Sequence, residues 1–114
     1  MRGGIEWLID AHGCAPERLR DRAAIAALLD RLVADIGLCV VATAVHVFGG
    51  AAGVTAIYLL AESHLSIHTF PETGYAALDA YCCTPRPAPA WAARIGEALG
   101  ARDVRVRELA RGEP

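Results

Sequence analysis

Hydrophobic and polar residues recur with two different periods along this chain, and each change of period marks a predicted element. Apolar residues at helical spacing from Pro16 to Gly37 predict one long amphipathic helix, which Gly37 ends. A second helix is predicted at 90–99, after a proline-rich linker. Strand patterns occupy six further segments: 5–11, 38–48, 54–61, 65–70, 75–83 and 104–109. This order predicts a single α+β domain over 1–114, a two-layer sandwich of a mainly antiparallel sheet with two helices on one face.

Alternation along the strands also predicts which side chains share a face of the sheet. In the strand at 65–70 the apolar face should pack against the helices, and the opposite face carries His64, Ser66, His68 and Phe70. In the strand at 75–83, Cys82 falls on the core side and Cys83 on the polar side. A free cysteine is most often a small buried hydrophobe, so this pattern alone makes Cys83 no more than a candidate.

Composition narrows the classes of function. The net charge is −2 and the arginines are spread among acidic residues, which predicts no basic face for nucleic acid. The chain has no lysine. It therefore cannot hold pyridoxal phosphate as a Schiff base, and imine chemistry would need a carbonyl that is part of the chain itself.

Targeting signals are not evident in the sequence. Residues 37–61 carry no formal charge and are long enough to span a bilayer. His46 and several glycines interrupt this segment, which favours two buried strands joined by a glycine-rich turn and predicts no membrane contact. Because no signal-peptide pattern precedes the first strand and the four cysteines form no disulfide framework, we expect a cytoplasmic protein.

Two common kinds of catalytic site are disfavoured by spacing. His64 and His68 on one strand would lie about 13 Å apart, too far for one metal ion, so no metal is expected. The chain also lacks the Gly-x-Ser-x-Gly turn of many serine hydrolases. On pattern alone, a hydrogen-bonded structural role is favoured for His68, as for most single histidines on a strand.

One long motif carries a family resemblance. The run Glu-Ser-His-Leu-Ser-Ile-His-Thr-Phe-Pro-Glu-Thr-Gly-Tyr-Ala-Ala-Leu-Asp at 62–79 closely resembles the prokaryotic S-adenosylmethionine decarboxylase proenzyme family. The likeness extends from Asp10-x-x-Gly-Cys14 to the closing Arg111-Gly112. It implies self-cleavage between Glu62 and Ser63, which gives a β chain of 1–62 and an α chain of 63–114. Ser63 would become a covalent pyruvoyl group, the carbonyl that a lysine-free chain needs.

The resemblance also implies roles for particular residues. His68 would be the proton acceptor in processing, and its ordinary pKa near 6.5 suits that task at neutral pH. Cys83 would be the proton donor in catalysis. Thr55 stands where the family usually has a serine that assists processing, and it keeps the hydroxyl with fewer rotamers. We expect a homodimer of cleaved protomers with sites at or near the interface.

Residues around the substrate are where the chain departs from its family. By resemblance Glu72 would bind the ribose hydroxyls and Phe48 would stack on adenine, although the loop after Phe48 has lost its proline. Phe70 replaces the usual tryptophan, and Glu6 stands where bacterial members have histidine. Because a carboxylate could hold a sulfonium, a guanidinium or an ammonium, two substrate classes stay open.

The leading hypothesis is decarboxylation of S-adenosylmethionine for spermidine and other polyamines. The alternative is the same chemistry on L-arginine or L-ornithine. A third possibility is a family member that does not cleave and serves as a binding or regulatory partner.

Overall fold

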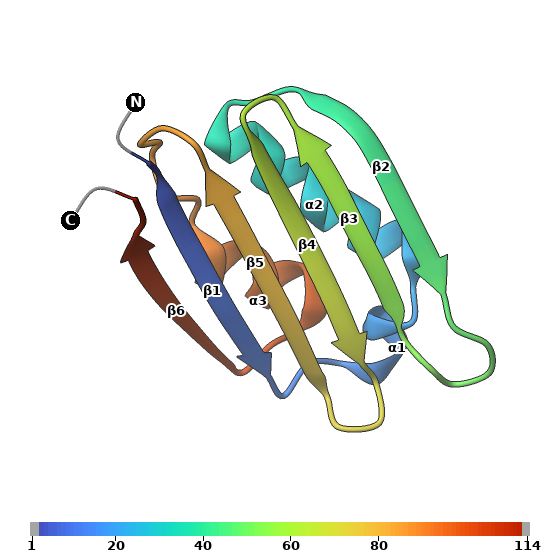
Figure 1. Cartoon of the computed structure of the whole chain (residues 1–114). Helices are drawn as coiled ribbons and strands as arrows, with labels where there is room; N and C mark the ends of the chain where they lie inside the picture. The colour runs from blue at the N-terminus through green and yellow to red at the C-terminus, as the bar shows by residue number, and fades with distance from the viewer. Residues whose placement is uncertain (1–2, 113–114) are drawn as a thin grey trace.

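The sheet and the helices form two layers. The computed structural model describes residues 3–112, and Figure 1 shows all the helices on one side of a single sheet. In chain order the elements are β1 (Ile5–His12), α1 (Pro16–Leu19), α2 (Arg22–Ile36), β2 (Val40–Val47), β3 (Val54–Leu60), β4 (Ser63–Phe70), β5 (Tyr75–Cys82), α3 (Trp91–Leu99) and β6 (Asp103–Ala110). The predicted α+β sandwich is confirmed.

The strand order of the sheet is β2-β3-β4-β5-β1-β6, and every neighbouring pair is antiparallel. Strands β2 to β5 follow one another as hairpins, and β1 and β6 extend the sheet beyond β5 (Figure 1). The uncharged segment predicted as two strands forms β2 and β3. Within residues 3–112, no helix is long and apolar enough to cross a membrane. Because neighbouring strands run in opposite directions, the hairpin turns after β2 and β4 lie at one end of the sheet and the turn after β3 lies at the other (Figure 1).

The first helical segment differs from its prediction. A single helix was expected from Pro16, whereas the chain forms a short α1 and then α2. Asp21 causes the break, because its backbone is extended and its carboxylate accepts hydrogen bonds from the N–H groups of Ala23 and Ala24, at 3.0 and 3.2 Å. An aspartate that caps a helix start is more stable there than inside a continuous helix. The predicted end at Gly37 is confirmed, with a left-handed φ of 81°.

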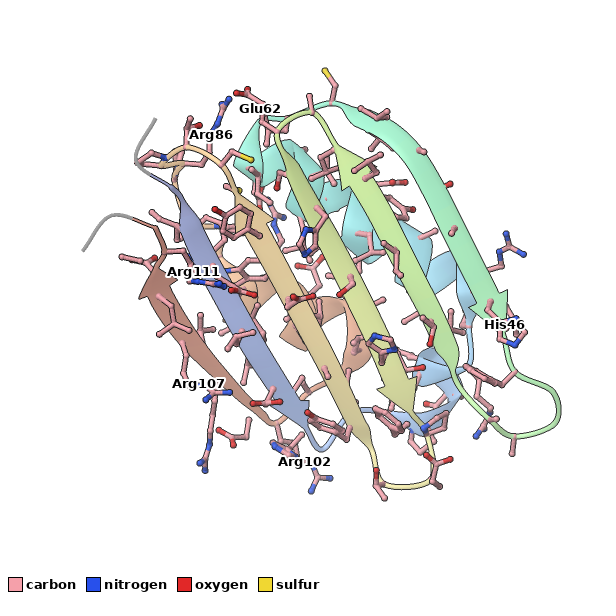
Figure 2. All side chains as sticks on the ribbon, in the orientation of Figure 1. His46, Glu62, Arg86, Arg102, Arg107 and Arg111 are labelled. Atoms are coloured by element: carbon pink, nitrogen blue, oxygen red, sulfur yellow. The ribbon has the colours of Figure 1, made fainter. Side chains whose placement is uncertain are left out.

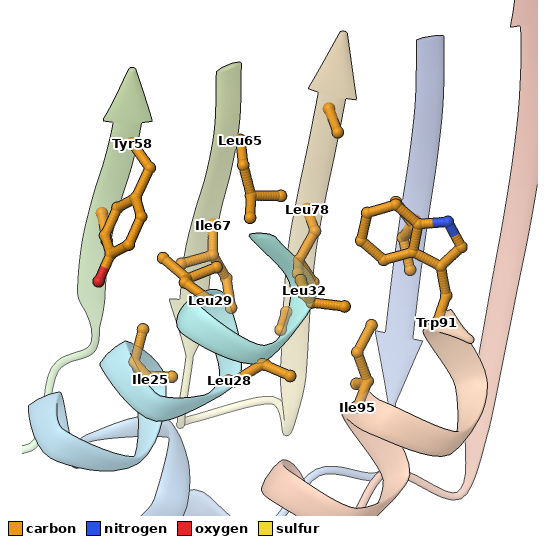
Figure 3. Packing of buried hydrophobic residues seen from close by; sticks show 14 of the residues in the cluster. Ile25, Leu28, Leu29, Leu32, Tyr58, Leu65, Ile67, Leu78, Trp91 and Ile95 are labelled. Atoms are coloured by element: carbon orange, nitrogen blue, oxygen red, sulfur yellow. The ribbon is translucent and has the colours of Figure 1, made fainter. Parts of the chain in front are cut away.

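One face of the sheet forms the core. Figure 3 shows side chains of α2 and α3 meeting the strands, and the labelled side chains include Leu29, Leu32 and Trp91 from the helices with Ile67 and Leu78 from the sheet. Each such side chain contributes about 1.5–3 kcal/mol when it is fully buried. The opposite face, which we call the open face, has no helix over it in the described chain. It exposes Ile57, Leu59 and Phe70, large apolar groups that a lone sheet leaves in water.

Candidate active site

The turn between β3 and β4 presents the predicted cleavage site. Glu62 has a φ of 65° and is the one non-glycine residue with a positive φ in residues 3–112. A side chain in this left-handed region costs free energy that the surrounding structure must offset. The backbone N–H of Cys83 donates a hydrogen bond of 2.9 Å to the Glu62 carbonyl oxygen. This donor fixes and polarises the carbonyl of the bond that the motif marks for cleavage.

The Ser63 side chain is buried on the helix-covered side of β4. Its hydroxyl donates to the Tyr81 carbonyl oxygen at 2.5 Å and lies 3.3 Å from the Cys82 sulfur. The prediction that Cys82 belongs to the core is confirmed, and Cys83 is half-buried just beyond β5. Sequence reasoning did not anticipate that Cys82, rather than Cys83, would be the thiol beside the Ser63 hydroxyl.

The Arg86 side chain lies beside the turn between β3 and β4. Figure 2 shows Arg86 and Glu62 together at this end of the sheet, and the Arg86 guanidinium is 3.9 Å from a Glu62 carboxylate oxygen. Both groups are partly exposed, so water weakens the attraction. The contact still joins the segment that follows β5 to the residue with the left-handed backbone. The motif gave no signal for Arg86, because it lies outside 62–79.

Glu6 lies on β1 opposite Tyr81, toward the Ser63 end of the sheet. Its carboxylate forms an ion pair with the Arg111 guanidinium. A carboxylate that is already neutralised by an arginine is a poorer partner for a second cation. The substrate-binding role predicted for Glu6 is untested, and this pairing weighs against it.

The opposite end of β4 carries the predicted base. His68 is exposed on the open face, and its Nδ1 lies 3.1 Å from the Thr55 hydroxyl on β3. The two residues are register partners in the β3–β4 ladder, so the pairing of the strands sets their contact. The Thr55 hydroxyl can orient the imidazole and fix which ring nitrogen carries the proton.

Aromatic side chains surround this end. The Phe70 ring stacks on Tyr75 with centroids 5.5 Å apart, and the Phe48 ring meets His46 edge-on at 4.5 Å. Phe48 and Phe70 are 47% and 41% exposed, so their remaining faces are free to pack on another group. Glu72 is exposed in the turn after β4. Phe48, Phe70 and Glu72 thus lie at the end of the sheet that carries His68.

A cavity of about 300 Å³ is lined in part by polar groups, among them Asp10, Ser66 and Asp79. Ser66 donates a hydrogen bond to Asp79, and the Tyr75 hydroxyl donates to Asp10 at 2.5 Å. That bond to the Asp10 carboxylate raises the pKa of the Tyr75 hydroxyl. Alternation along β5 predicted Asp79 on the open face, but sequence reasoning assigned no role to Asp10 or Asp79. In residues 3–112 no cluster of histidine, cysteine and carboxylate groups could hold a metal ion.

Comparisons with known proteins cover almost the whole chain. The family model described as "S-adenosylmethionine decarboxylase" matches residues 5–112. A protein of Moorella thermoacetica named S-adenosylmethionine decarboxylase proenzyme is 35% identical over 110 residues, which are 96% of this chain and 87% of that protein. A Pyrococcus furiosus protein of the same name is 36% identical over 110 residues, 96% of this chain and 78% of its own. The chain belongs to the S-adenosylmethionine decarboxylase family.

The fold of this family is also found in a solved structure. The crystal structure of the adenosylmethionine decarboxylase from Aquifex aeolicus matches with a TM-score of 0.80 and 29% identity, over 99% of this chain and 93% of that one. The family resemblance predicted from the motif at 62–79 is therefore confirmed. The match includes both ends of β4, so all the predicted site residues lie in the part of the chain that is shared with this structure.

The predicted site residues of this decarboxylase-family chain fall into two separate groups. Ser63 and His68 are five residues apart on a straight strand, which corresponds to about 16 Å. Their side chains also lie on opposite faces of β4. Within one protomer the predicted residues therefore form two groups. The first contains Glu6, Glu62, Ser63 and Cys83, and the second contains Phe48, Thr55, His68, Phe70 and Glu72.

Proposed function

We propose that this chain is a pyruvoyl-dependent decarboxylase that converts S-adenosylmethionine to its decarboxylated form, after cleaving itself between Glu62 and Ser63. The observation that carries the proposal is the Glu62 turn. A left-handed backbone and a carbonyl held at 2.9 Å by the Cys83 N–H occur at the bond that the motif marks. The likeness to proteins named S-adenosylmethionine decarboxylase proenzyme supports both the reaction class and the substrate.

Cleavage would begin with the hydroxyl of Ser63. It must leave the Tyr81 carbonyl oxygen and attack the Glu62 carbonyl carbon, which converts the amide into an ester and frees the Ser63 amine. Negative charge then develops on the Glu62 oxygen, where the Cys83 N–H already donates. A positioned donor of this kind is a common source of transition-state stabilisation.

Elimination would complete the cleavage. A base removes the Ser63 Cα proton, the bond between Cβ and Oγ breaks, and Glu62 leaves as a carboxylate. The resulting dehydroalanine tautomerises, water replaces its nitrogen, and ammonia is released. The proton that the base removes belongs to the backbone Cα. His68 therefore does not need to share the side-chain face of Ser63, but it must approach the bond more closely than about 16 Å.

A second protomer would bring a His68 side chain close to the Glu62–Ser63 bond. Two sheets that pack on their open faces lie about 10 Å apart. If a two-fold axis runs in that plane across the strands, the Ser63 end of one β4 lies over the His68 end of the other. Each composite site would contain Ser63 and Cys83 of one protomer with Thr55, His68 and the aromatic groups of its partner. The exposed Ile57 and Leu59 would be buried by the same contact.

In catalysis the pyruvoyl carbonyl would supply the electron sink for decarboxylation. Cys83, half-buried beyond β5, would return a proton to the substrate α-carbon. Phe48 and Phe70 would hold adenine between aromatic faces, and Glu72 would accept hydrogen bonds from the ribose. The ion pair of Glu6 with Arg111 leaves no free carboxylate at that position for a cationic group of any of these substrates, so the choice of S-adenosylmethionine rests on the names of the relatives.

Two measurements test the proposal. Intact mass spectrometry of the purified protein should show two fragments, 1–62 and 63–114, with the second beginning in a pyruvoyl group. A single unmodified chain would exclude an enzyme of this kind. Release of carbon dioxide is then compared among S-adenosylmethionine, arginine and ornithine. Release from a basic amino acid alone would contradict the proposed substrate.

A further inference from the structure

The two edges of the sheet differ in charge. The β2 edge is eight residues long and bears no charged side chain. Its valines Val40, Val41 and Val47 are 44%, 63% and 44% exposed, and Val45 alone among its valines packs partly against the core. The β6 edge carries four charged residues among eight: Asp103, Arg105, Arg107 and Glu108. Charged residues on an edge strand oppose pairing with another chain, whereas a long apolar edge invites it.

The β2 edge also has backbone groups available for hydrogen bonds. The Phe48 N–H donates to the Gly53 carbonyl oxygen at 3.0 Å, which directs Phe48 toward β3. Alternation along an antiparallel ladder then directs His46 and Ala44 toward β3 as well. The backbone groups of Thr43 and Val45 consequently point out of the sheet. In the described chain nothing pairs with that side of β2.

We propose that β2 pairs antiparallel with β2 of a second copy, so that the two sheets become one continuous sheet. The pairing is self-complementary because a two-fold axis perpendicular to the sheet reverses the strand and keeps the helices of both copies on one side. Such an axis sets odd-numbered residues opposite odd-numbered ones and even-numbered opposite even-numbered ones. A register centred on Ala44 places the axis away from the bulge between Val40 and Ala42. Thr43 then exchanges backbone hydrogen bonds with the second copy's Val45. No like charges meet.

A second copy fits this edge better than the alternative of β2 against β6. Head-to-tail pairing of β2 with β6 would continue without limit, and it would place an uncharged edge beside the charged one. Pairing of β2 with β2 closes after two copies. The edge contact is also compatible with packing on the open faces. An axis that exchanges the two ends of β4 places β2 over β2, so both contacts can close together in a tetramer.

Disulfide capture tests the register. Ala44→Cys, made in a Cys39→Ser background, places two thiols on the axis, where opposite Cβ atoms approach within about 4.5–5.5 Å. Mild oxidation should link most of the protein into covalent pairs on a non-reducing gel. Adding Val47→Lys to the same chain should prevent the link, because this change opposes pairing at the edge and leaves the open faces as they are. Ala42→Cys in the same background is the matched control, because its thiols would lie about 13 Å apart. Equal capture of the two variants, or no capture of Ala44→Cys, would overturn the proposal.

Light scattering after gel filtration tests the edge without any new thiol. Val47→Lys adds a charge to β2 on the helix side of the sheet, on the face opposite to the open face, and it replaces none of the proposed active-site residues. The assembly mass should fall two-fold relative to wild type. Val106→Lys on β6, where the valine is 42% exposed, is the matched control and should leave the mass unchanged. An unchanged mass for Val47→Lys, or an equal fall for Val106→Lys, would contradict pairing at this edge.

Discussion

The two ends of β4 differ in how completely one protomer builds them. At the Ser63 end the side chain is buried, the Glu62 carbonyl is held by the Cys83 N–H, and Arg86 lies against Glu62. At the other end His68 is exposed and contacts the Thr55 hydroxyl. The difference indicates a division of work. In the proposed mechanism, folding of one chain positions the bond that is cut, and a second chain supplies the base that acts on it.

The sharpest test of the Ser63 end is Ser63→Ala, which should abolish cleavage completely because no nucleophile remains at the bond. Intact mass spectrometry would show one chain of full length. Ser66→Ala is a matched control, since Ser66 lies on the open face with its hydroxyl bonded to Asp79. Cleavage of the Ser63→Ala protein before residue 63, or failure of the Ser66→Ala protein to cleave at all, would argue against the assignment.

His68→Ala tests the His68 end and should slow cleavage by about 10²–10⁴-fold, the usual contribution of a positioned base. The comparison becomes decisive in mixed dimers. Co-expression of His68→Ala with Ser63→Ala creates one composite site that has an intact Ser63 and an intact His68. The His68→Ala chain should then be cleaved at a rate near that of wild type. If it is cleaved no faster than in its own homodimer, the base does not come from the partner. His64→Ala, four residues away, serves as the control.

The neighbouring cysteines Cys82 and Cys83 can be replaced separately to test whether a backbone group or a side chain acts at the Ser63 end. Cys83→Ala keeps the N–H that holds the Glu62 carbonyl, so cleavage should remain detectable while decarboxylation falls by at least about 10²-fold. Cys82→Ala removes a buried sulfur beside Ser63 and should chiefly lower stability, by about 1 kcal/mol in urea unfolding. Should Cys82→Ala prove more damaging to turnover, the proton donor is the thiol on the core side.

Sequence reasoning predicted the layers and the faces of this fold because alternation along strands is set by the backbone itself. The core position of Cys82 and the open-face position of His68 both followed from that rule. The break at Asp21 was missed, because a capping side chain competes with helix continuation at one residue and leaves the apolar stripe unchanged.

The candidate site was less predictable than the fold. The motif gathers Ser63 and His68 within six residues of sequence, which suggests one compact site. A strand separates the same two residues by about 16 Å. Their separation therefore depends on secondary structure. Their proposed approach depends on how a second copy of the chain packs against the first, which the pattern of residues along one chain does not indicate. Arg86 and the Arg111 partner of Glu6 were also missed, because ion pairs between distant segments leave no periodic signal.

Arg86→Ala sharpens the comparison at the Ser63 end, because it removes the ion pair with Glu62 and leaves the backbone hydrogen bond in place. We expect cleavage to slow by about 2–5-fold, consistent with a partly exposed pair. Arg86→Lys should recover part of the rate. Arg105→Ala, which breaks an exposed pair with Asp103 on β6, should leave the rate unchanged. Equal rates for Arg86→Ala and wild type in a time course of fragment formation would exclude a role for Arg86 at the Ser63 end.

The smallest effect is expected from a change in the helical layer, which lies behind both ends of β4. Arg94 on α3 donates two hydrogen bonds to Asp35 on α2, at 2.9 and 3.0 Å, and this contact lowers the pKa of the Asp35 carboxyl below its ordinary 3.8. A lowered carboxyl pKa stabilises the fold above pH 3.8, and that contribution is lost as the pH falls through the lower folded value. Asp35→Asn should therefore reduce the melting temperature at pH 7 by less than about 5 °C. The difference from wild type should shrink toward pH 3, with cleavage at pH 7 unaffected. A change in the cleavage rate would mean that the helical layer helps to build the Ser63 end, and the contrast between the two ends of β4 would then extend through the whole protomer.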